Sequence, residues 1–220
     1  MEFVYRPLSQ QYQFPDVQGV LPDRWMPVPP YPALFGCGQQ AAQILGCRRF
    51  PPSGRLKRFI RWMAARDPSW RHSGQQLAAT TPVTEPEVLA DTYILWTRPE
   101  DPEMQLHGDK WLQTSRNKMR RTFHGATVTE IDTRCGPGSR AIIREQTQAG
   151  VARTSLTYWV CTEDPHAVLT VETTIDGDGD HEPFVAQSDL IVQSLAHAPG
   201  VEVVWGPQLT DEQARKLAGQ

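Results

Sequence analysis

Five short stretches rich in strand-forming residues occur between residues 88 and 175, and they limit the fold of the chain more than any other feature. In the last of them, AVLTVETTI, side chains such as Leu169 and Val171 alternate with Glu172 and Thr174, which is the period of a sheet with one better-buried face. The turn sequences CGPGSR and EDPH indicate hairpins between neighbouring stretches. The predicted strands are residues 88–97, 127–133, 141–146, 154–162 and 167–175.

Two amphipathic stretches interrupt these strands. KWLQTSRNKMRRTF follows Asp109, a suitable helix cap, and Pro183 stands at the first turn of PFVAQSDLIVQSLAHA. The order is therefore β–α–β–β–β–β–α. Adjacent antiparallel strands with inserted helices favour an α+β fold, in which helices flank an antiparallel sheet, over a doubly wound parallel fold.

The chain has 220 residues, which suits one domain with appendages. Its first 36 residues contain seven of the 19 prolines, so they are unsuited to regular helix or to a central strand. We expect a proline-rich N-terminal arm over residues 1–36, with one short strand. A single α+β domain over residues 37–200 would follow, with a basic helical insertion at 48–72, and residues 201–220 would form a C-terminal extension.

The four cysteines lie far apart, at positions 37, 47, 135 and 161, without a C-x-x-C pair. Buried thiols in a reducing compartment are expected, with a Cys37–Cys47 bridge as the alternative. The opening residues MEFVYRPLSQQYQF lack the features of a secretory signal, and no apolar run approaches the ~20 residues needed to cross a bilayer. These observations predict a cytoplasmic protein.

A cationic amphipathic helix is predicted from GRLKRFIRWMAARDPSWRH, which begins at Gly54. Its apolar residues fall at helical spacing, and the Asp67-Pro68 pair ends the run. Residues 48–72 carry a local charge of +7. Because the net charge of the chain is −3, the remaining residues together carry −10. The next residues, 80–87, contain Pro82 and Pro86 and are expected to form a linker or loop.

Three interpretations of this helix are open. It is a solvated helix face packed on the sheet, a contact for a protein partner with an acidic surface, or a contact for phosphate or an anionic membrane. Nucleic acid is not expected, because the sequence has no recognised motif for it and the remainder is acidic. The predicted partner-binding residues are Arg55, Lys57, Arg58, Arg61 and Trp62.

No complete catalytic signature occurs in the sequence. There is no G-x-S-x-G, H-E-x-x-H, Walker loop or dinucleotide fingerprint, and the six histidines form no i, i+4 pair. We therefore expect a non-catalytic protein without a cofactor. The alternative is an enzyme with a carboxylate-based pocket, supplied by Glu100, Asp101 and Glu103 or by the acids of residues 176–182.

The stretch TTIDGDGDHEPF places aspartates at 176, 178 and 180, where a calcium loop of EF-hand type begins. His181 stands where that loop needs glycine, and Gln187 stands where it needs a bidentate glutamate. A strand-to-helix corner explains the stretch better, since its glycines permit a turn and its acids complement a helix N-terminus. A weak calcium site with Asp176, Asp178 and Asp180 as ligands is the alternative.

The LPDRW opening at residues 21–25, the late strand AVLTVETTI, the acidic loop and the closing helix with LIVQSL resemble the PsbP/Mog1-like superfamily, in particular its LpqN-type members and the type VI secretion effector chaperones. The resemblance covers roughly residues 16–195 and rests on pattern. It implies an α/β/α sandwich with a binding, assembly or chaperone role and no chemistry. The signal and the lipid-anchoring cysteine of the lipoprotein branch are not found in the sequence. A chaperone-like adaptor that uses the basic helix as its interface is the function we predict.

Overall fold

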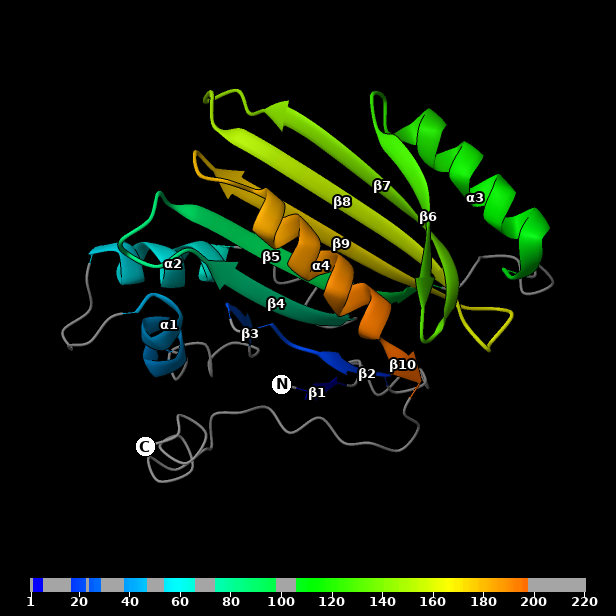
Figure 1. The fold of residues 1–220 in the computed structure, drawn as a ribbon, viewed down its shortest axis with the longest axis horizontal. Coiled ribbons are helices and arrows are strands. Elements are labelled where there is room, and N and C mark those ends of the chain that lie inside the picture. The colour runs from blue at the N-terminus through cyan, green and yellow to red at the C-terminus, as the bar shows by residue number, and fades with distance from the viewer. Residues whose placement is uncertain are drawn as a thin grey trace.

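A seven-stranded antiparallel sheet forms the centre of the protein (Figure 1). The structure is a computed structural model that describes residues 2–5, 17–22, 24–28, 38–46, 54–65, 74–97 and 106–197. The strands lie in the order β3-β4-β5-β9-β8-β7-β6, and every neighbouring pair is antiparallel. Their bounds are β3 Trp25–Pro27, β4 Gly74–Thr80, β5 Val88–Thr97, β6 Thr127–Thr133, β7 Gly136–Gln146, β8 Ala152–Cys161 and β9 Val168–Gly177.

Alternation along these strands gives the sheet two unlike faces. Ile94, Val171 and Tyr158 are paired directly across β5, β9 and β8, and all three are buried in the main hydrophobic core. The next residues along each strand point to the opposite face, because successive side chains of a strand alternate. That face carries Tyr93 and Glu172, which are only partly buried.

Helix α4 (Glu182–Ser194) covers the apolar face of the sheet. Its buried residues include Phe184, whose ring meets the Trp25 ring edge to face with the centroids 6.4 Å apart. The indole Nε1 of Trp25 donates a hydrogen bond to Gln187 Oε1 at 2.9 Å. Trp25 therefore joins β3 to α4. A small sheet of β1 (Glu2–Tyr5), β2 (Val17–Val20) and β10 (Ala196–His197) lies beside the helix and contacts it through β2.

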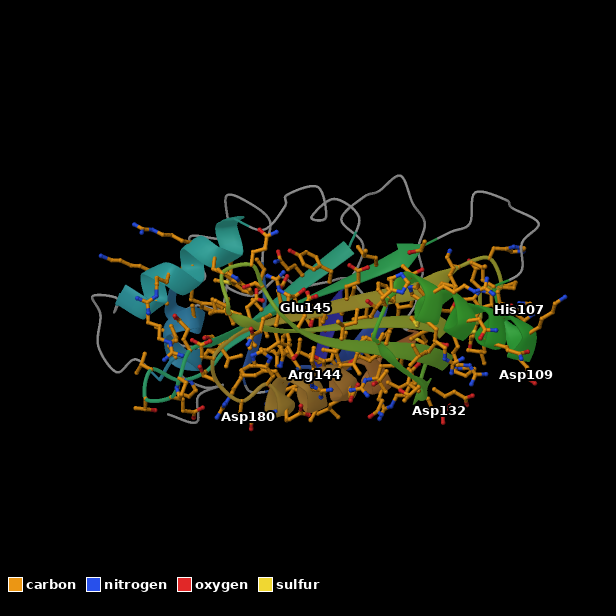
Figure 2. All side chains as sticks on the ribbon, turned by 90° about the horizontal axis from the view of Figure 1, so that it is seen from above. His107, Asp109, Asp132, Arg144, Glu145 and Asp180 are labelled. Carbon is orange, nitrogen blue, oxygen red and sulfur yellow. The ribbon has the colours of Figure 1, made fainter. Side chains whose placement is uncertain are left out.

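Separate helices cover the two ends of the opposite face (Figure 2). At the β3–β4 end, α1 (Gly38–Ile44) and α2 (Gly54–Ala65) form a second hydrophobic cluster with Met26 and Ala78. At the β6–β7 end, α3 (Gly108–Thr122) packs on β7 and β6, and the Ser115 and Ser139 hydroxyl oxygens lie 2.9 Å apart. Between these helices the face is crossed by β5, β9 and β8.

The predicted α+β class, with helices flanking an antiparallel sheet, is confirmed. The predictions for residues 88–97 and 127–133 match β5 and β6, and the predicted amphipathic helices correspond to α2, α3 and α4. Three features differ from the expectations. Residues 74–80 form β4, which was not predicted, and the arm contributes three strands where one was expected. Asp109 lies in the first turn of α3, and His107 holds the cap position.

Some sequence-based predictions lie outside the described residues. These include the Cys37–Cys47 bridge, the ends of the basic insertion at 48–53 and 66–72, and the C-terminal extension. Among the described segments, no helix combines the length and the apolar character that a bilayer crossing requires.

Candidate binding surfaces

Helix α2 is held on the sheet by its predicted apolar stripe. Leu56, Phe59 and Met63 recur at helical spacing and are fully buried in the cluster shared with α1, β3 and β4. Burying a side chain of this size stabilises the fold by about 2 kcal/mol. Ile60 and Trp62 pack partly buried against the same cluster, and the Trp62 ring stacks on Phe59 with the centroids 6.1 Å apart.

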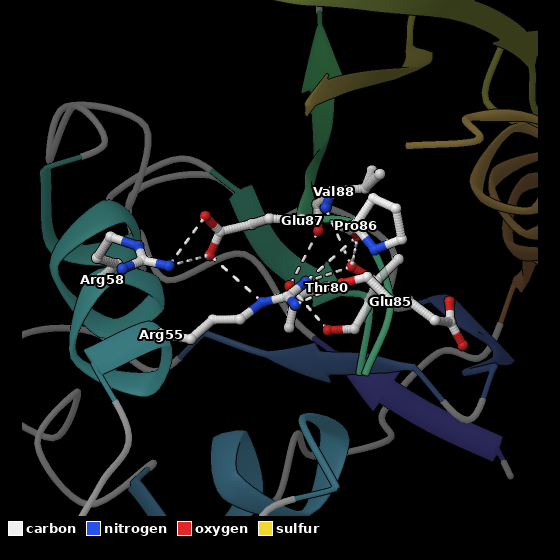
Figure 3. A network of polar contacts seen from close by, with 8 residues as sticks. Arg55, Arg58, Thr80, Glu85, Pro86, Glu87 and Val88 are labelled. Carbon is white, nitrogen blue, oxygen red and sulfur yellow. Dashed lines mark hydrogen bonds and ion pairs between the residues drawn. The ribbon is translucent and has the colours of Figure 1, made fainter. Parts of the chain in front are cut away.

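Arg55 is directed into the protein and holds α2 against the loop between β4 and β5 (Figure 3). Its guanidinium donates hydrogen bonds to Thr81 Oγ1 at 2.5 Å and to the Glu85 carbonyl at 2.7 Å. Its Nε lies 3.4 Å from Glu87 Oε1, and only 11% of the side chain is exposed. Arg55 therefore fixes the helix in place, and this geometry does not suit the partner-contacting role predicted for it.

The loop that receives Arg55 is itself closed by hydrogen bonds from two threonines. The Thr81 hydroxyl donates to the Pro86 carbonyl at 2.6 Å and accepts from the Val88 amide at 3.0 Å. The Thr80 hydroxyl donates to the Val88 carbonyl at 2.9 Å. Residues 81–87, expected to be a linker or loop, are thus a compact connection between β4 and β5.

Three cations remain on the outer surface of α2. Lys57 and Arg61 are exposed, and neither forms an ion pair within the described part of the chain. Arg58 is 61% exposed and shares Glu87 with Arg55, at 3.4 Å. We call Lys57, Arg58 and Arg61 the basic face of α2. It has an excess of positive charge, because a single carboxylate serves two of the four cations that the helix carries.

A second basic group lies on α3, at the other end of the sheet (Figure 1). Lys110, Lys118, Arg120 and Arg121 are exposed there, while Arg116 pairs with Glu130 of β6. Among the described residues the two groups do not form one continuous strip, because β5, β9 and β8 separate the helices. This arrangement differs from the continuous basic stripe that nucleic-acid binding favours.

The aspartates of TTIDGDGDHEPF lie where β9 turns into α4. Asp176 pairs with Arg153, with oxygen–nitrogen distances of 2.6 and 3.2 Å, and Asp180 Oδ1 accepts a hydrogen bond from the Glu182 amide at 3.0 Å. Asp178 is exposed. Within the described ranges, no group of three His, Cys, Asp or Glu residues is arranged to hold a metal ion. The geometry is that of the strand-to-helix corner.

The glycines of this corner are required by close packing. Gly177 has φ +140°, and a Cβ there would collide with the Glu87 carbonyl oxygen. A Cβ on Gly179 would come 2.6 Å from Val88 Cγ2. The corner therefore lies directly against the β4–β5 loop that receives Arg55.

His181 joins the start of α4 to the sheet. Its Nε2 lies 2.9 Å from the Gly177 carbonyl, and its Nδ1 lies 2.9 Å from the Thr154 hydroxyl. Because a carbonyl only accepts, Nε2 carries the proton, and in the neutral ring Nδ1 accepts from Thr154. The ring is thus held by the protein on both sides.

A polar network lies beneath α4. The Tyr158 hydroxyl donates to Asp189 Oδ1 at 2.8 Å, and Arg140 Nε lies 2.9 Å from the same oxygen. Burial raises the pKa of Asp189, and the hydrogen bond from Tyr158 and the charge of Arg140 lower it by less. Burial also raises the pKa of the Tyr158 hydroxyl. These three side chains fasten α4 to β8 and β7.

Sequence reasoning missed a second surface, on the opposite face between α2 and α3. We define the central strip as the partly exposed side chains that β5, β9 and β8 present there: Tyr93, Leu95, Glu172, Thr174, Thr157 and Trp159. Burial raises the pKa of Glu172. The only sequence feature that could have indicated this surface was Glu172, a charged residue at the middle of the alternating strand β9. The other predicted carboxylates, Glu100, Asp101 and Glu103, lie outside the described residues.

The architecture defines an α+β protein in which one face of an antiparallel sheet is covered by a single helix and the other by helices at its two ends. No protein-family model matches the chain, and no curated protein matches it.

Solved structures resemble it in fold alone. One is LpqN of Mycobacterium tuberculosis, described as involved in cell envelope biogenesis; it is 13% identical with a TM-score of 0.46, over 90% of this chain and 91% of that chain. LpqN-type proteins are among those that the sequence resembles, and the likeness concerns the fold alone. Another is a protein of Bacteroides thetaiotaomicron, 10% identical with a TM-score of 0.38, over 84% of this chain and 46% of that chain.

Proposed function

We propose that the chain is a non-catalytic protein-binding module whose basic face on α2 contacts an acidic surface of a partner protein. The observation that carries this proposal is that α2 uses different side chains for packing and for its exposed surface. Leu56, Phe59 and Met63 bury one side of the helix, and Arg55 ties its first turn to the β4–β5 loop. Lys57, Arg58 and Arg61 are left exposed on a helix that is already fixed.

Fixing the helix favours binding, because a surface that is ordered before association loses less conformational entropy when it binds. Long cationic side chains at such a surface attract an acidic partner over the Debye length and orient it before contact. The stacked Trp62 lies beside the cations and offers an aromatic surface, of the kind enriched at interfaces.

The test is a comparison of two charge reversals of equal size. One variant carries Lys57→Glu, Arg58→Glu and Arg61→Glu on α2, and the control carries Lys110→Glu, Arg120→Glu and Arg121→Glu on α3. A protein captured from lysate is purified, and its affinity for the wild type and both variants is measured by calorimetry at two salt concentrations. We expect the α2 variant to bind at least about tenfold more weakly, the control to bind like the wild type, and the wild-type affinity to fall with salt.

Equal binding by the wild type and the α2 variant would contradict the proposal, provided that circular dichroism shows the variant to be folded. Peripheral contact with an anionic membrane is the competing outcome. It predicts sedimentation with phosphatidylserine vesicles that the same α2 variant loses, and no captured protein whose affinity depends on α2.

A further inference from the structure

Glu172 occupies an unusual position at the middle of the central strip. Its register neighbours are Tyr93 on β5 and Thr157 on β8, so it lies between two strands on the face away from α4. Its side chain is only partly exposed, and no hydrogen bond or ion pair joins its carboxylate to any residue in the described ranges. A carboxylate that loses water without gaining a partner costs free energy.

Two other half-buried acids, one in the sheet and one in α4, are partnered. Asp176 pairs with Arg153 on the neighbouring strand β8, and Asp189 of α4 is held by Arg140 and Tyr158. At both positions an arginine serves as the counter-charge of the carboxylate. Glu172 has no arginine partner within the described ranges, so its charge is available for a group that comes from outside the chain.

Aromatic rings lie on both sides of this carboxylate. Tyr93 is directly opposite Glu172, and Trp159 lies diagonally across β8, at the cross-strand separation that large side chains span. The Trp159 ring already accepts a cation, because Lys118 Nζ of α3 lies 5.7 Å from its centroid. A carboxylate with neighbouring aromatic faces is the combination that recognises a positively charged side chain.

We propose that the central strip binds an arginine side chain of a partner protein, with Glu172 as its counter-charge and with Tyr93 and Trp159 as the rings beside it. A guanidinium is planar, so it stacks on an aromatic ring while its N–H groups donate in pairs to a carboxylate. The Thr157 and Thr174 hydroxyl oxygens flank Glu172 and can accept the remaining N–H groups. This site is independent of the basic face of α2, which favours the opposite charge.

The test uses two capped tripeptides, Gly-Arg-Gly and Gly-citrulline-Gly, which have nearly the same shape but differ in charge. Binding is followed by amide chemical shifts in two-dimensional NMR of the full chain. We expect the arginine peptide to shift the amides of β5, β9 and β8 around Glu172, and the citrulline peptide to bind at least about tenfold more weakly.

The variant Glu172→Gln keeps the size of the side chain and removes its charge. The matched control is Glu145→Gln, which removes an exposed carboxylate on β7; Figure 2 shows Glu145 on the side of the sheet away from α4. We expect Glu172→Gln to weaken the arginine peptide about tenfold and Glu145→Gln to leave it unchanged. A melting temperature of Glu172→Gln that is no lower than that of the wild type shows that the loss concerns binding and not folding.

Equal affinity for the two peptides, or unchanged binding by Glu172→Gln, would overturn the proposal. Binding that shifts amides elsewhere would overturn it as well. A concentration-dependent dimer that is lost both in Glu172→Gln and in a variant with Arg58→Ala and Arg61→Ala would replace the partner protein by a second copy of this chain. Failure at the central strip leaves the proposal for α2 intact, because the α2 and α3 variants test that surface separately.

Discussion

Asp189 and Glu172 lie on opposite sides of the same sheet, and burial raises the pKa of both carboxyl groups. Asp189 accepts a hydrogen bond from Tyr158 and pairs with Arg140, so it connects α4 to β8 and β7. For Glu172, desolvation is the only cause of the raised pKa, and its carboxylate has no partner among the described residues. Burial therefore raises the pKa of both acids, but only Asp189 has partners among the described residues.

This difference separates a structural carboxylate from a candidate binding group. Removing Asp189 leaves Tyr158 without its acceptor and Arg140 without its counter-charge, whereas removing the charge of Glu172 leaves no described group unpartnered. One substitution should therefore destabilise the fold and the other should not. A raised pKa alone would not have distinguished the two.

The largest expected effect comes from Asp189→Ala. It removes the acceptor of Tyr158 and the counter-charge of Arg140, and we expect a loss of about 2 kcal/mol in the free energy of unfolding. Urea denaturation monitored by tryptophan fluorescence measures it, with Asp178→Ala at an exposed position as the control. If the two variants are equally stable, the network does not hold α4 and the contrast with Glu172 fails.

Tyr158→Phe isolates the hydrogen bond within this network. The ring of Tyr158 is fully buried, and phenylalanine preserves its packing while Asp189 keeps Arg140. We expect a loss of about 1 kcal/mol by the same urea measurement. A loss as large as that of Asp189→Ala would show that the hydroxyl, and not the ion pair, holds the helix.

Glu172→Gln should stabilise the protein at pH 7. A folded-state pKa above the unfolded value gives a contribution to stability that is complete below the unfolded pKa and lost as pH rises through the folded pKa. The wild type bears this loss at neutral pH and the variant does not. The difference in melting temperature should therefore vanish below a pH of about 4, near the ordinary pKa of glutamate. A variant less stable than the wild type at pH 7 would show that Glu172 has a structural partner.

The reactivity of the two buried thiols, Cys135 and Cys161, measures how readily each face of the sheet opens to solvent. Cys135 belongs to the core under α4, and Cys161 pairs with Val168 on the other face. Burial raises the pKa of Cys135 to about 12 and that of Cys161 to about 11. In a variant with Cys37→Ser and Cys47→Ser, iodoacetamide should react slowly with both at pH 8, and Cys161 should react first as the pH rises. Faster reaction of Cys135 would show that the α4 face opens more readily.

The sequence predicted well the elements whose pattern is local. Strands β5 and β6 are rich in strand-forming residues and are bounded by turn residues, so their limits were predicted correctly. Strand β4, GQQLAAT, was missed because two glutamines and three small residues give little contrast between its faces. Gln76 and Thr80 are nevertheless buried, since α1, α2 and β3 cover this end of the sheet.

The candidate surfaces could be predicted only in part, because they depend on contacts between residues that are distant in sequence. The apolar stripe of α2 was predicted because it repeats within the helix, but the inward direction of Arg55 depends on Thr81 and Glu85, nearly 30 residues later. Glu172 was placed on the less buried face without being singled out. Its importance depends on where α2 and α3 lie, and the alternation within β9 contains no information about that.

The contact of Gly177 and Gly179 with the β4–β5 loop has a consequence for how this chain can change during evolution. The loop receives Arg55 on one side and the corner before α4 on the other, so its path is limited from both directions. Substitutions at Val83 and Thr84, which are exposed, should be tolerated. Insertions between Thr81 and Val88 should be rare among related chains, and a lengthened loop should persist only together with a change at residue 55 or in the β9–α4 corner.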